Sequence, residues 1–388
     1  MSKIAVCLMG GHSKGTRFRP LSLTTPKPFF RVGGHSIPEW IMKSTRFSKI
    51  YFIGFYAPEE INDPLKRLGN KYNIEVEYLM EPDALGTAGG LLHFESIILK
   101  DNPQQICLLH SDVLCSFPID DMLKTHGDNL VTILTTQVLE SVSNRFGCLV
   151  IDQDNKLMHY AEKPESFISN WINGGVYIIS SKLFKQLPQY NEEDNVTSPT
   201  ASPIKKQGFK KLSLERTVLP QLAGSGLIKV YRYDGYWAQL KTANSAIALN
   251  TLALHTFDVD KPTQSNIIAP CSIHPTADIS PNAKIGPNVS IGPNVHIGDG
   301  VRVRDAIIAE HTHVDPYAII MHSVVGKNDF IGKWARVEGS PLSQVEVVFG
   351  NLKASNLVGS KVPSSDENNY VVNGVKQQSA TILGKCCY

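Results

Sequence analysis

The sequence predicts an α/β protein made of a mixed sheet domain over residues 1–257 and a left-handed parallel β-helix over residues 258–388. Two patterns carry this prediction. In the first part, apolar β-rich runs alternate with amphipathic stretches, which is typical of a mostly parallel sheet covered by helices. In the second part, an aliphatic residue recurs at every sixth position, which is the signature of hexapeptide repeats stacked as a β-helix. A chain of 388 residues is long enough for both parts to bury a core of their own.

The expected strands of the first part are four apolar runs, at residues 4–9, 49–56, 74–80 and 105–110. Residues 58–72 and 86–99, which lie between these runs, have the amphipathic pattern of helices. In a sheet of this kind, ligands bind beyond the carboxyl ends of the strands. The stretches GGHSKGTR and HSDV each follow an expected strand, so both point to the same crevice.

The rest of the first part contains one polar interruption. Residues 189–211 are rich in Ser, Thr and Pro, and we expect a disordered surface loop there. Strand and helix patterns resume after this loop in LERTVLPQLAG and LIKVYRYDGYWAQL. Residues 244–257 are the expected helix that closes the domain.

The second part follows a six-residue period whose phase slips. The aliphatic positions of the regular stretch are Ile273, Ile279, Ile285, Ile291, Ile297 and Val303, and a small or β-branched residue stands two positions before each of the last five. At DAIIAEH the period shortens, because Ile308 follows Val303 by only five residues, and it then resumes. A polar insertion is expected at residues 340–378, before a last coil-like stretch.

Composition and charge exclude several classes of function. The formal net charge of +2, with 19% charged residues, gives no case for a nucleic-acid-binding surface or a polybasic membrane anchor. No apolar run reaches the length of a membrane span, and the first apolar run is too short for a signal peptide. The seven cysteines are scattered and form no CxxC pair, which favours reduced thiols in a cytoplasmic protein over structural zinc.

The stretch GGHSKGTRFRP, residues 10–20, has the glycines and cations of a phosphate-binding loop. Its order differs both from GxxxxGK[ST] and from GxGxxG. Glycines allow backbone N–H groups to approach phosphate oxygens closely. Arg17 and Lys27 add side-chain donors that carry a positive charge. The stretch therefore predicts a site for a phosphorylated ligand.

The longer string GG…GTRxRPLS…TPKP resembles the signature GGxGTRLxPLTxxxPKP of the sugar-1-phosphate nucleotidyltransferases. Four further stretches, EPDALGTAGGL, HSDVL, AEKP and INGGVYIIS, resemble motifs of this family and come in the same order. The family often has a hexapeptide domain after its first domain. The resemblance thus covers nearly the whole chain and implies a Rossmann-like nucleotidyltransferase-type sheet domain.

The family joins a sugar-1-phosphate oxygen to the α-phosphorus of a nucleoside triphosphate, and pyrophosphate leaves. Such catalysis depends mostly on positioning and on neutralising charge, with magnesium held by carboxylates. The resemblance implies a role for each matching residue: Arg17 and Lys27 as catalytic cations, Gly10, Gly11, Gly15, Thr16, Glu81, Gly86 and Thr87 around the nucleotide, Glu162, Lys163 and Asn173 around the sugar phosphate, and Asp112 as the first metal ligand.

Within the family, the likeness is greatest to the GDP-mannose pyrophosphorylases, which have a catalytic beta subunit and a related alpha subunit. Two departures favour the alpha type. The loop GGHSKGTR is two residues longer than GGxGTR, and GYWAQLK has Gln239 where the catalytic pattern GxWxDIG has its second metal-binding Asp. A neutral amide attracts Mg²⁺ less than a carboxylate does, and Lys241, in place of the last Gly, adds a competing positive charge.

The resemblance therefore implies a subunit that binds GDP-mannose and regulates a catalytic beta subunit, within a hetero-oligomer that also self-associates. One alternative is an active enzyme that makes GDP-mannose and pyrophosphate from GTP and mannose-1-phosphate. A more remote alternative is a hexapeptide acyltransferase, which would leave the motifs of the first part without a use.

Overall fold

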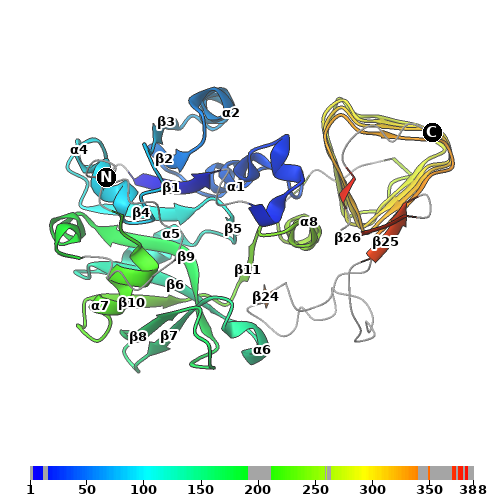
Figure 1. Ribbon diagram of the computed structural model, residues 1–388. Helices are drawn as coiled ribbons and strands as arrows, with labels where there is room; N and C mark the ends of the chain where they lie inside the picture. Colours follow the sequence, from blue (N-terminus) through cyan, green and yellow to red (C-terminus); the bar gives the residue numbers. More distant parts are fainter. Residues whose placement is uncertain are drawn as a thin grey trace, which may run out of the picture. The chain divides into compact units, whose positions relative to one another are not determined.

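The computed structural model describes residues 3–11, 16–190, 211–257, 259 and 264–339, together with four short strands between residues 348 and 382. These elements form two compact units (Figure 1). Unit 1 comprises Met1–His12 and Ile41–Gly235, and unit 2 comprises Ser13–Trp40 and Tyr236–Tyr388. Residues 236–257, which the sequence pattern assigned to the first domain, thus pack in unit 2 together with the segment 13–40.

Unit 1 is built on a nine-stranded mixed sheet, as expected from the alternating pattern. Its main path runs in the order β10-β6-β9-β4-β1-β2-β3, and the hairpin of β7 and β8 joins the sheet at β9. The pairs β1–β2, β2–β3, β1–β4 and β6–β10 are parallel, whereas β9 runs antiparallel to β4 and β6. The strands are β1 (Ile4–Gly11), β2 (Lys49–Phe55), β3 (Glu75–Met80), β4 (Gln105–His110), β6 (Val131–Gln137), β7 (Gly147–Ile151), β8 (Leu157–Glu162), β9 (Trp171–Ser180) and β10 (Ile228–Arg232).

The helices of unit 1 confirm one sequence prediction and correct another. Helix α2 (Pro58–Tyr72) has the predicted bounds and stops at Asn73, whose φ of 53° lies in the left-handed region. The single helix expected over 86–99 is wrong, because the chain forms two short helices there, α3 (Gly89–His93) and α4 (Glu95–Ile98). The other helices are α5 (Ile119–His126), α6 (Glu140–Ser143), α7 (Leu219–Leu222) and a π-turn at Leu214–Val218.

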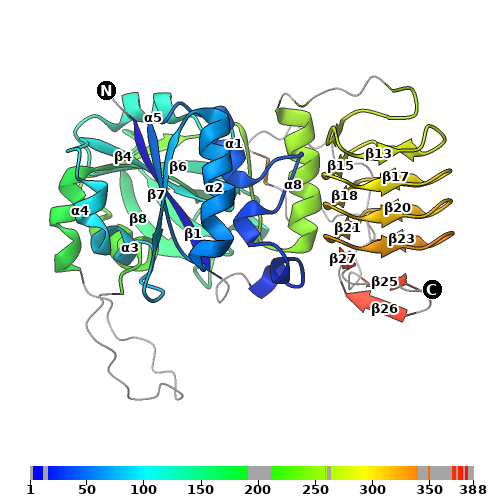
Figure 2. The same cartoon turned by 90° about the horizontal axis from the view of Figure 1, so that it is seen from above.

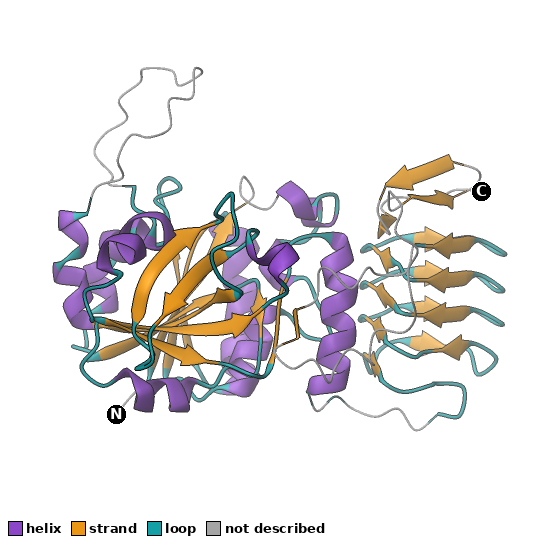
Figure 3. Cartoon of the chain, turned by 90° about the horizontal axis from the view of Figure 1, so that it is seen from below, coloured by secondary structure: helices purple, strands orange, loops and turns teal. Residues whose placement is uncertain are grey.

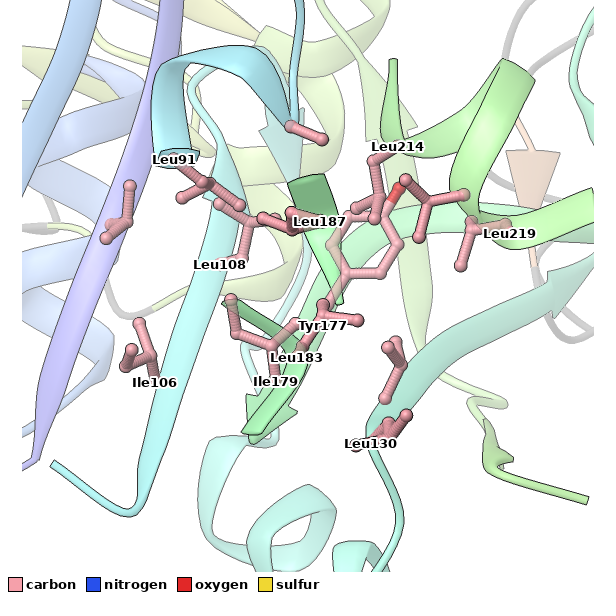
Figure 4. Close-up of a cluster of buried hydrophobic side chains, with 14 of the residues drawn as sticks. Leu91, Ile106, Leu108, Leu130, Tyr177, Ile179, Leu183, Leu187, Leu214 and Leu219 are labelled. Carbon is pink, nitrogen blue, oxygen red and sulfur yellow. The ribbon is translucent and has the colours of Figure 1, made fainter. Parts of the chain in front are cut away.

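The core of unit 1 forms around the middle strands of the sheet. Figure 4 shows Tyr177 of β9 among aliphatic side chains from β4, α3 and the segment after residue 211. The labelled members of this cluster are Leu91, Ile106, Leu108, Leu130, Ile179, Leu183, Leu187, Leu214 and Leu219. Burial of apolar area stabilises the unit by about 25 cal/mol per Å². The same packing places the hydroxyl of Tyr177 deep inside the unit, where it requires a polar partner.

Unit 2 contains the β-helix that the six-residue period predicts. Its short strands stack into three parallel columns, β12-β15-β18-β21-β27, β13-β16-β19-β22 and β14-β17-β20-β23 (Figure 3). The strands are β12 (Cys271–Ile273), β13 (Asp278–Ile279), β14 (Lys284–Ile285), β15 (Val289–Ile291), β16 (His296–Ile297), β17 (Arg302–Arg304), β18 (Ala306–Ile308), β19 (His313–Val314), β20 (Ile319–Met321), β21 (Val324–Val325), β22 (Phe330–Ile331), β23 (Arg336–Glu338) and β27 (Thr381–Ile382).

The slip in the period appears as a change in coil length, since each coil after the first is one residue shorter. In the first coil Cys271 pairs with Val289, but in the next coil Val289 pairs with Ala306, one residue sooner. The aliphatic positions predicted to face inward form the core of these coils, with the first two, Ile273 and Ile279, only partly buried at the start. The coil therefore absorbs the missing residue without turning its aliphatic side chains outward.

Helix α8 (Ala243–Thr256) is the predicted closing helix, and it packs against β15, β18 and β21 (Figure 2). Its wholly buried Asn250 joins three segments of unit 2. The side-chain oxygen accepts from the Gly33 N–H at 2.8 Å and from the Ser290 hydroxyl at 2.6 Å, and the side-chain amide donates to the Asn288 carbonyl at 3.1 Å. This asparagine thus ties the β-helix to α8 and to the segment 13–40.

Two sequence predictions fall mainly outside the described residues. Of the polar loop predicted at 189–211, residues 191–210 lie there, and so does most of the insertion predicted at 340–378. The described strands of that insertion are β24 (Val348–Phe349), β25 (Asn369–Val372) and β26 (Val375–Gln378). Among the helices that are described, none combines the length and apolar character needed to cross a bilayer.

Candidate functional site

Glycines bring β1 and β2 together at the carboxyl end of β1. The register shifts by one residue between Leu8 and Gly10, so that Gly10 pairs with Gly54. A Cβ atom on Gly11 would lie 2.7 Å from the Cβ of Phe55, and one on Gly54 would lie 2.9 Å from the carbonyl oxygen of Gly10. Only glycine fits this approach, which gives Gly10 and Gly11 a structural reason in addition to their predicted contact with phosphate.

The rest of the predicted phosphate loop divides between undescribed residues and unit 2. Gly15 lies outside the described residues, so its predicted role remains a prediction. Thr16 and Arg17 are exposed on a 3₁₀ turn (Thr16–Phe18), and Lys27 begins a second such turn, both in unit 2. Phe18 and Phe30 pack edge to face at 5.0 Å and anchor the segment that carries both cations.

The loop after β3 is held from two directions. The Glu81 N–H donates to the Gly54 carbonyl at 2.8 Å, and a Cβ on Gly90 would lie 2.8 Å from the Glu81 carboxylate. Gly86 has a φ of +85°, and a Cβ there would lie 2.6 Å from the carbonyl oxygen of Leu212. That carbonyl accepts from the N–H groups of residues 88 and 89 at 3.0 and 2.9 Å. The segment at 212 thus fixes the loop that carries Gly86 and Thr87.

One buried carboxylate, that of Glu215, gathers polar groups from three parts of unit 1. The Thr87 hydroxyl donates to it at 2.5 Å, and the Tyr177 hydroxyl donates at 3.3 Å. His110 Nε2 lies 3.4 Å from its Oε1 atom, and the Ser213 hydroxyl donates at 3.3 Å. The Leu214 N–H in turn donates to the Thr87 oxygen at 2.8 Å. The network therefore links the loop at Thr87, the end of β4 and the strand β9.

The two titratable groups at the centre of this network, Glu215 and His110, shift each other's pKa in opposite directions. Burial acts to raise the pKa of Glu215, but contact with His110 and the hydrogen bond from Thr87 outweigh burial and lower that pKa to about 2. Burial acts to lower the pKa of His110, but the Glu215 carboxylate outweighs it and raises that pKa above its usual value. Glu215 is therefore ionised at neutral pH and can only accept hydrogen bonds.

The residues predicted to contact the sugar phosphate lie next to this network. Asn173 of β9 donates to the hydroxyl oxygens of Tyr160 at 3.0 Å and Tyr177 at 2.8 Å. The Tyr160 hydroxyl donates to Glu162 Oε2 at 3.0 Å, and Lys163 Nζ lies 2.9 Å from Glu162 Oε1. The structure thus brings the predicted residues Thr87, Glu162, Lys163 and Asn173 into one connected set of polar contacts.

The backbone at Lys163 is held in an unusual conformation. Its φ of 51° is in the left-handed region, which costs a residue other than glycine about 1–3 kcal/mol. The Lys163 N–H donates to the Phe146 carbonyl at 3.0 Å and thereby helps to retain this conformation. The role predicted for Lys163 at the sugar phosphate remains a prediction.

The predicted metal ligands belong to different units. Asp112 follows β4 in unit 1, where the Ser111 N–H donates to the Leu8 carbonyl at 3.0 Å. Gln239 is the last residue of β11 (Tyr236–Gln239) in unit 2, and its buried side-chain oxygen has no hydrogen-bond partner among the described residues. In the whole described part of the chain, no three His, Cys, Asp or Glu side chains are grouped to hold a metal ion.

Five side chains of the network were not among the residues predicted from sequence: His110, Tyr160, Tyr177, Ser213 and Glu215. Tyr160 carries a signal that could have found it, because it stands two positions before Glu162 and so shares one face of β8 with it. Tyr177 lies within the stretch INGGVYIIS. Glu215 has only the weak signal of a lone acid next to an apolar run.

Comparison with known proteins agrees with this architecture. A family model described as Nucleotidyl transferase matches residues 4–250, and one described as GMPPB C-terminal domain matches residues 267–385. The chain is 43% identical over 357 residues to the mannose-1-phosphate guanylyltransferase regulatory subunit alpha of Dictyostelium discoideum, covering 87% of this chain and 86% of that relative. It is 41% identical over 357 residues to the subunit of the same name from Rattus norvegicus, covering 87% and 84%.

A third relative and one solved structure complete the comparison. A probable mannose-1-phosphate guanyltransferase of Schizosaccharomyces pombe is 36% identical over 405 residues, covering all of this chain and 93% of the relative. The crystal structure of a putative glucose-1-phosphate thymidylyltransferase from Bacillus anthracis has a TM-score of 0.53 at 20% identity and covers 67% of this chain and 98% of that chain. At that identity the structure supports the fold alone.

Proposed function

Since the chain belongs to the nucleotidyl transferase family, we propose that it is an alpha-type subunit of mannose-1-phosphate guanylyltransferase. In this role it binds GDP-mannose and regulates a catalytic beta subunit. The observation that carries the proposal is Gln239, which stands where the resemblance places a metal-binding carboxylate. The relatives named regulatory subunit alpha, similar over 87% of this chain, support it.

The binding half of the proposal rests on the polar network of unit 1. Glu162 accepts hydrogen bonds only, and both N–H groups of Asn173 are already used by tyrosine oxygens. These two side chains therefore offer acceptors to a ligand, and Lys163 Nζ adds a donor with a positive charge. Acceptors for hydroxyl groups beside a cation for a phosphate are the chemistry that a sugar phosphate needs.

The regulatory half of the proposal rests on charge. Mg²⁺ takes oxygen ligands, typically one or two carboxylates together with substrate phosphates. The resemblance implies one carboxylate ligand at Asp112 and a second at position 239, where this chain has the neutral amide of Gln239. Magnesium, when bound, would neutralise charge on the phosphates. The residues present match the expected pair of carboxylates only in part, so we propose weak magnesium binding and little turnover by this chain alone.

Two measurements on the purified chain test this proposal. Titration calorimetry with GDP-mannose should show binding, and incubation with GTP, mannose-1-phosphate and Mg²⁺ should release little pyrophosphate. Adding the chain to its catalytic relative should change the inhibition of that enzyme by GDP-mannose, because a regulator must couple two binding events. Rapid pyrophosphate release by the chain alone that is lost in Asp112→Asn would refute the regulatory role.

One observation favours a second candidate, an active guanylyltransferase. The Schizosaccharomyces pombe relative, which is similar over the whole chain, is named as a probable mannose-1-phosphate guanyltransferase. Asp112, Arg17 and Lys27 are all present for the same chemistry. The pyrophosphate assay decides between the two candidates, since only the second requires turnover without a partner.

A further inference from the structure

Both amide hydrogens of the Asn173 side chain have a hydrogen-bond partner in the structure. Its Oδ1 atom accepts from the Gly175 N–H at 3.0 Å, and a backbone N–H can only donate. The amide must therefore turn its nitrogen toward the two tyrosine oxygens, Tyr160 at 3.0 Å and Tyr177 at 2.8 Å. Both N–H groups are then used, and a single lone pair of Oδ1 remains.

The partners of the two tyrosine hydroxyls lead to the same orientation of the Asn173 amide. A hydroxyl that accepts from Asn173 must donate its own hydrogen elsewhere. Tyr177 donates to Glu215 Oε1 at 3.3 Å, and Tyr160 donates to Glu162 Oε2 at 3.0 Å. The ionised Glu215 carboxylate cannot donate in return and the Gly175 N–H cannot accept, so the chain of hydrogen bonds through Tyr177 cannot reverse.

Of the two carboxylates that accept from the tyrosines, Glu215 is more buried than Glu162. Its side chain is 13% exposed, and Tyr177 is wholly buried. The short hydrogen bond from Thr87 and the contact with His110 hold the carboxylate from two other segments, so its position does not depend on a ligand. Asn173 itself is only 8% exposed, which leaves little freedom for its amide to rotate.

We propose that Glu215 is a positioning residue that sets the polarity of the sugar subsite. Through Tyr177 it commits one N–H group of Asn173 to the protein, while Tyr160 takes the other and the Gly175 N–H holds Oδ1. Asn173 then meets a ligand only as a hydrogen-bond acceptor through Oδ1. The subsite then selects a sugar that presents a donating hydroxyl at this point, over one with an acceptor-only substituent there. This inference rests on the proposed binding of a nucleotide sugar.

The experiment compares the wild-type chain with Tyr177→Phe and Glu215→Gln. Calorimetry gives the dissociation constants for GDP-mannose and for GDP, and their ratio isolates the contribution of the mannose. Tyr177→Phe removes the acceptor of one Asn173 N–H, whereas Glu215→Gln replaces the ionised acceptor of Tyr177 with a neutral amide that can also donate. We expect each to weaken GDP-mannose binding, about tenfold for Tyr177→Phe, which corresponds to one lost hydrogen bond, and less for Glu215→Gln, with GDP binding unchanged. Tyr51→Phe is the matched control, since Tyr51 is equally buried and donates to the Ile97 carbonyl away from Asn173.

A second set of ligands reports polarity directly. GDP-mannose derivatives with fluorine in place of one hydroxyl, at C2, C3, C4 or C6, keep the size of the group but cannot donate. One of them should bind the wild-type chain at least tenfold more weakly than GDP-mannose, and Tyr177→Phe should reduce that difference. A purely structural role of Tyr177 would instead lower the affinities for all ligands and for GDP together.

Three outcomes would overturn the inference. In the first, the wild-type chain binds all four fluorinated derivatives as tightly as GDP-mannose. In the second, Tyr177→Phe and Glu215→Gln lower GDP and GDP-mannose binding to the same extent, as a loss of folding would. In the third, the wild-type chain binds neither GDP nor GDP-mannose, which overturns the proposed function as well and so is distinct from the first two.

Discussion

The substitution Gly147→Ala tests how tightly unit 1 is packed around the Tyr160 hydroxyl. Gly147 of β7 pairs with Glu162 of β8, and a Cβ atom added to it would lie 2.1 Å from the Tyr160 hydroxyl oxygen and 2.8 Å from Glu162 Oε2. An ordinary contact begins at 3.4 Å, so the hydroxyl would have to move by about 1.3 Å, the difference between 3.4 and 2.1 Å. Tyr160 is 2% exposed and has little room to do so.

The expected cost follows from these contacts. Moving the hydroxyl breaks its hydrogen bonds to Asn173 and Glu162, each of which is 3.0 Å long. Two such bonds contribute about 1–3 kcal/mol together. Overpacking adds about 1–3 kcal/mol. The free energy of unfolding, measured with urea, should therefore fall by about 2–6 kcal/mol.

Two further variants make this prediction specific. In Gly147→Ala/Tyr160→Phe the oxygen nearest to the new methyl group is absent, so the double variant should be less destabilised than the sum of the single variants, by at least about 1 kcal/mol. Gly332→Ala is the control, because a Cβ there meets no atom within 4 Å. Additive single effects, or a Gly147→Ala variant as stable as Gly332→Ala, would refute the steric reasoning.

Three other substitutions probe separate parts of the chain. Asn250→Ala should lower the free energy of unfolding of the chain by about 2–4 kcal/mol, because it leaves the Gly33 N–H buried without its acceptor and removes the bond to Ser290; a urea midpoint equal to that of wild type would contradict this. Burial lowers the pKa of His126 to about 4, so the unfolded state binds the proton more readily, and stability present above pH 6.5 should be lost as the pH falls toward 4. Allowing for partial solvent screening, we expect the free energy of unfolding to fall by about 1–2 kcal/mol between pH 7 and pH 4.5, and by less in His126→Gln. The same dependence of stability on pH in the wild type and in His126→Gln would count against the lowered pKa of His126. Gln239→Asp should tighten Mg²⁺ binding in the presence of GTP severalfold by calorimetry, as a carboxylate replaces a neutral amide, and an unchanged Mg²⁺ affinity would show that this position does not face the metal.

Local patterns were sufficient for some elements and insufficient for others. Helix α2 has the predicted bounds because its apolar period, its first-turn proline and Asn73 at its end all lie within the segment itself. The helix predicted over 86–99 starts late, at Gly89, where the carbonyl of Leu212 accepts from the N–H groups of residues 88 and 89, and it divides at Phe94. That acceptor is more than 100 residues away in sequence, so no local pattern could reveal it.

The candidate site divides in the same way. The family-like stretches identified Thr87, Glu162 and Asn173, and the structure links them in one network. They did not identify Glu215, because its importance comes from which side chains surround it and not from its neighbours in sequence. The direction of each hydrogen bond around Asn173 depends on Gly175 and on two carboxylates, which meet only in the folded chain.

By itself, the sequence determined the order of the elements, the six-residue period of the β-helix and the residues that resemble a nucleotide-sugar site. These depend on side-chain periodicity and on short motifs, both of which are local. The tertiary structure decided that the segment with Arg17 and Lys27 packs in the same unit as α8 and the β-helix. It did so because Asn250 and the glycine at 33 join these segments across more than 200 residues, through a hydrogen bond that only the packed chain can form.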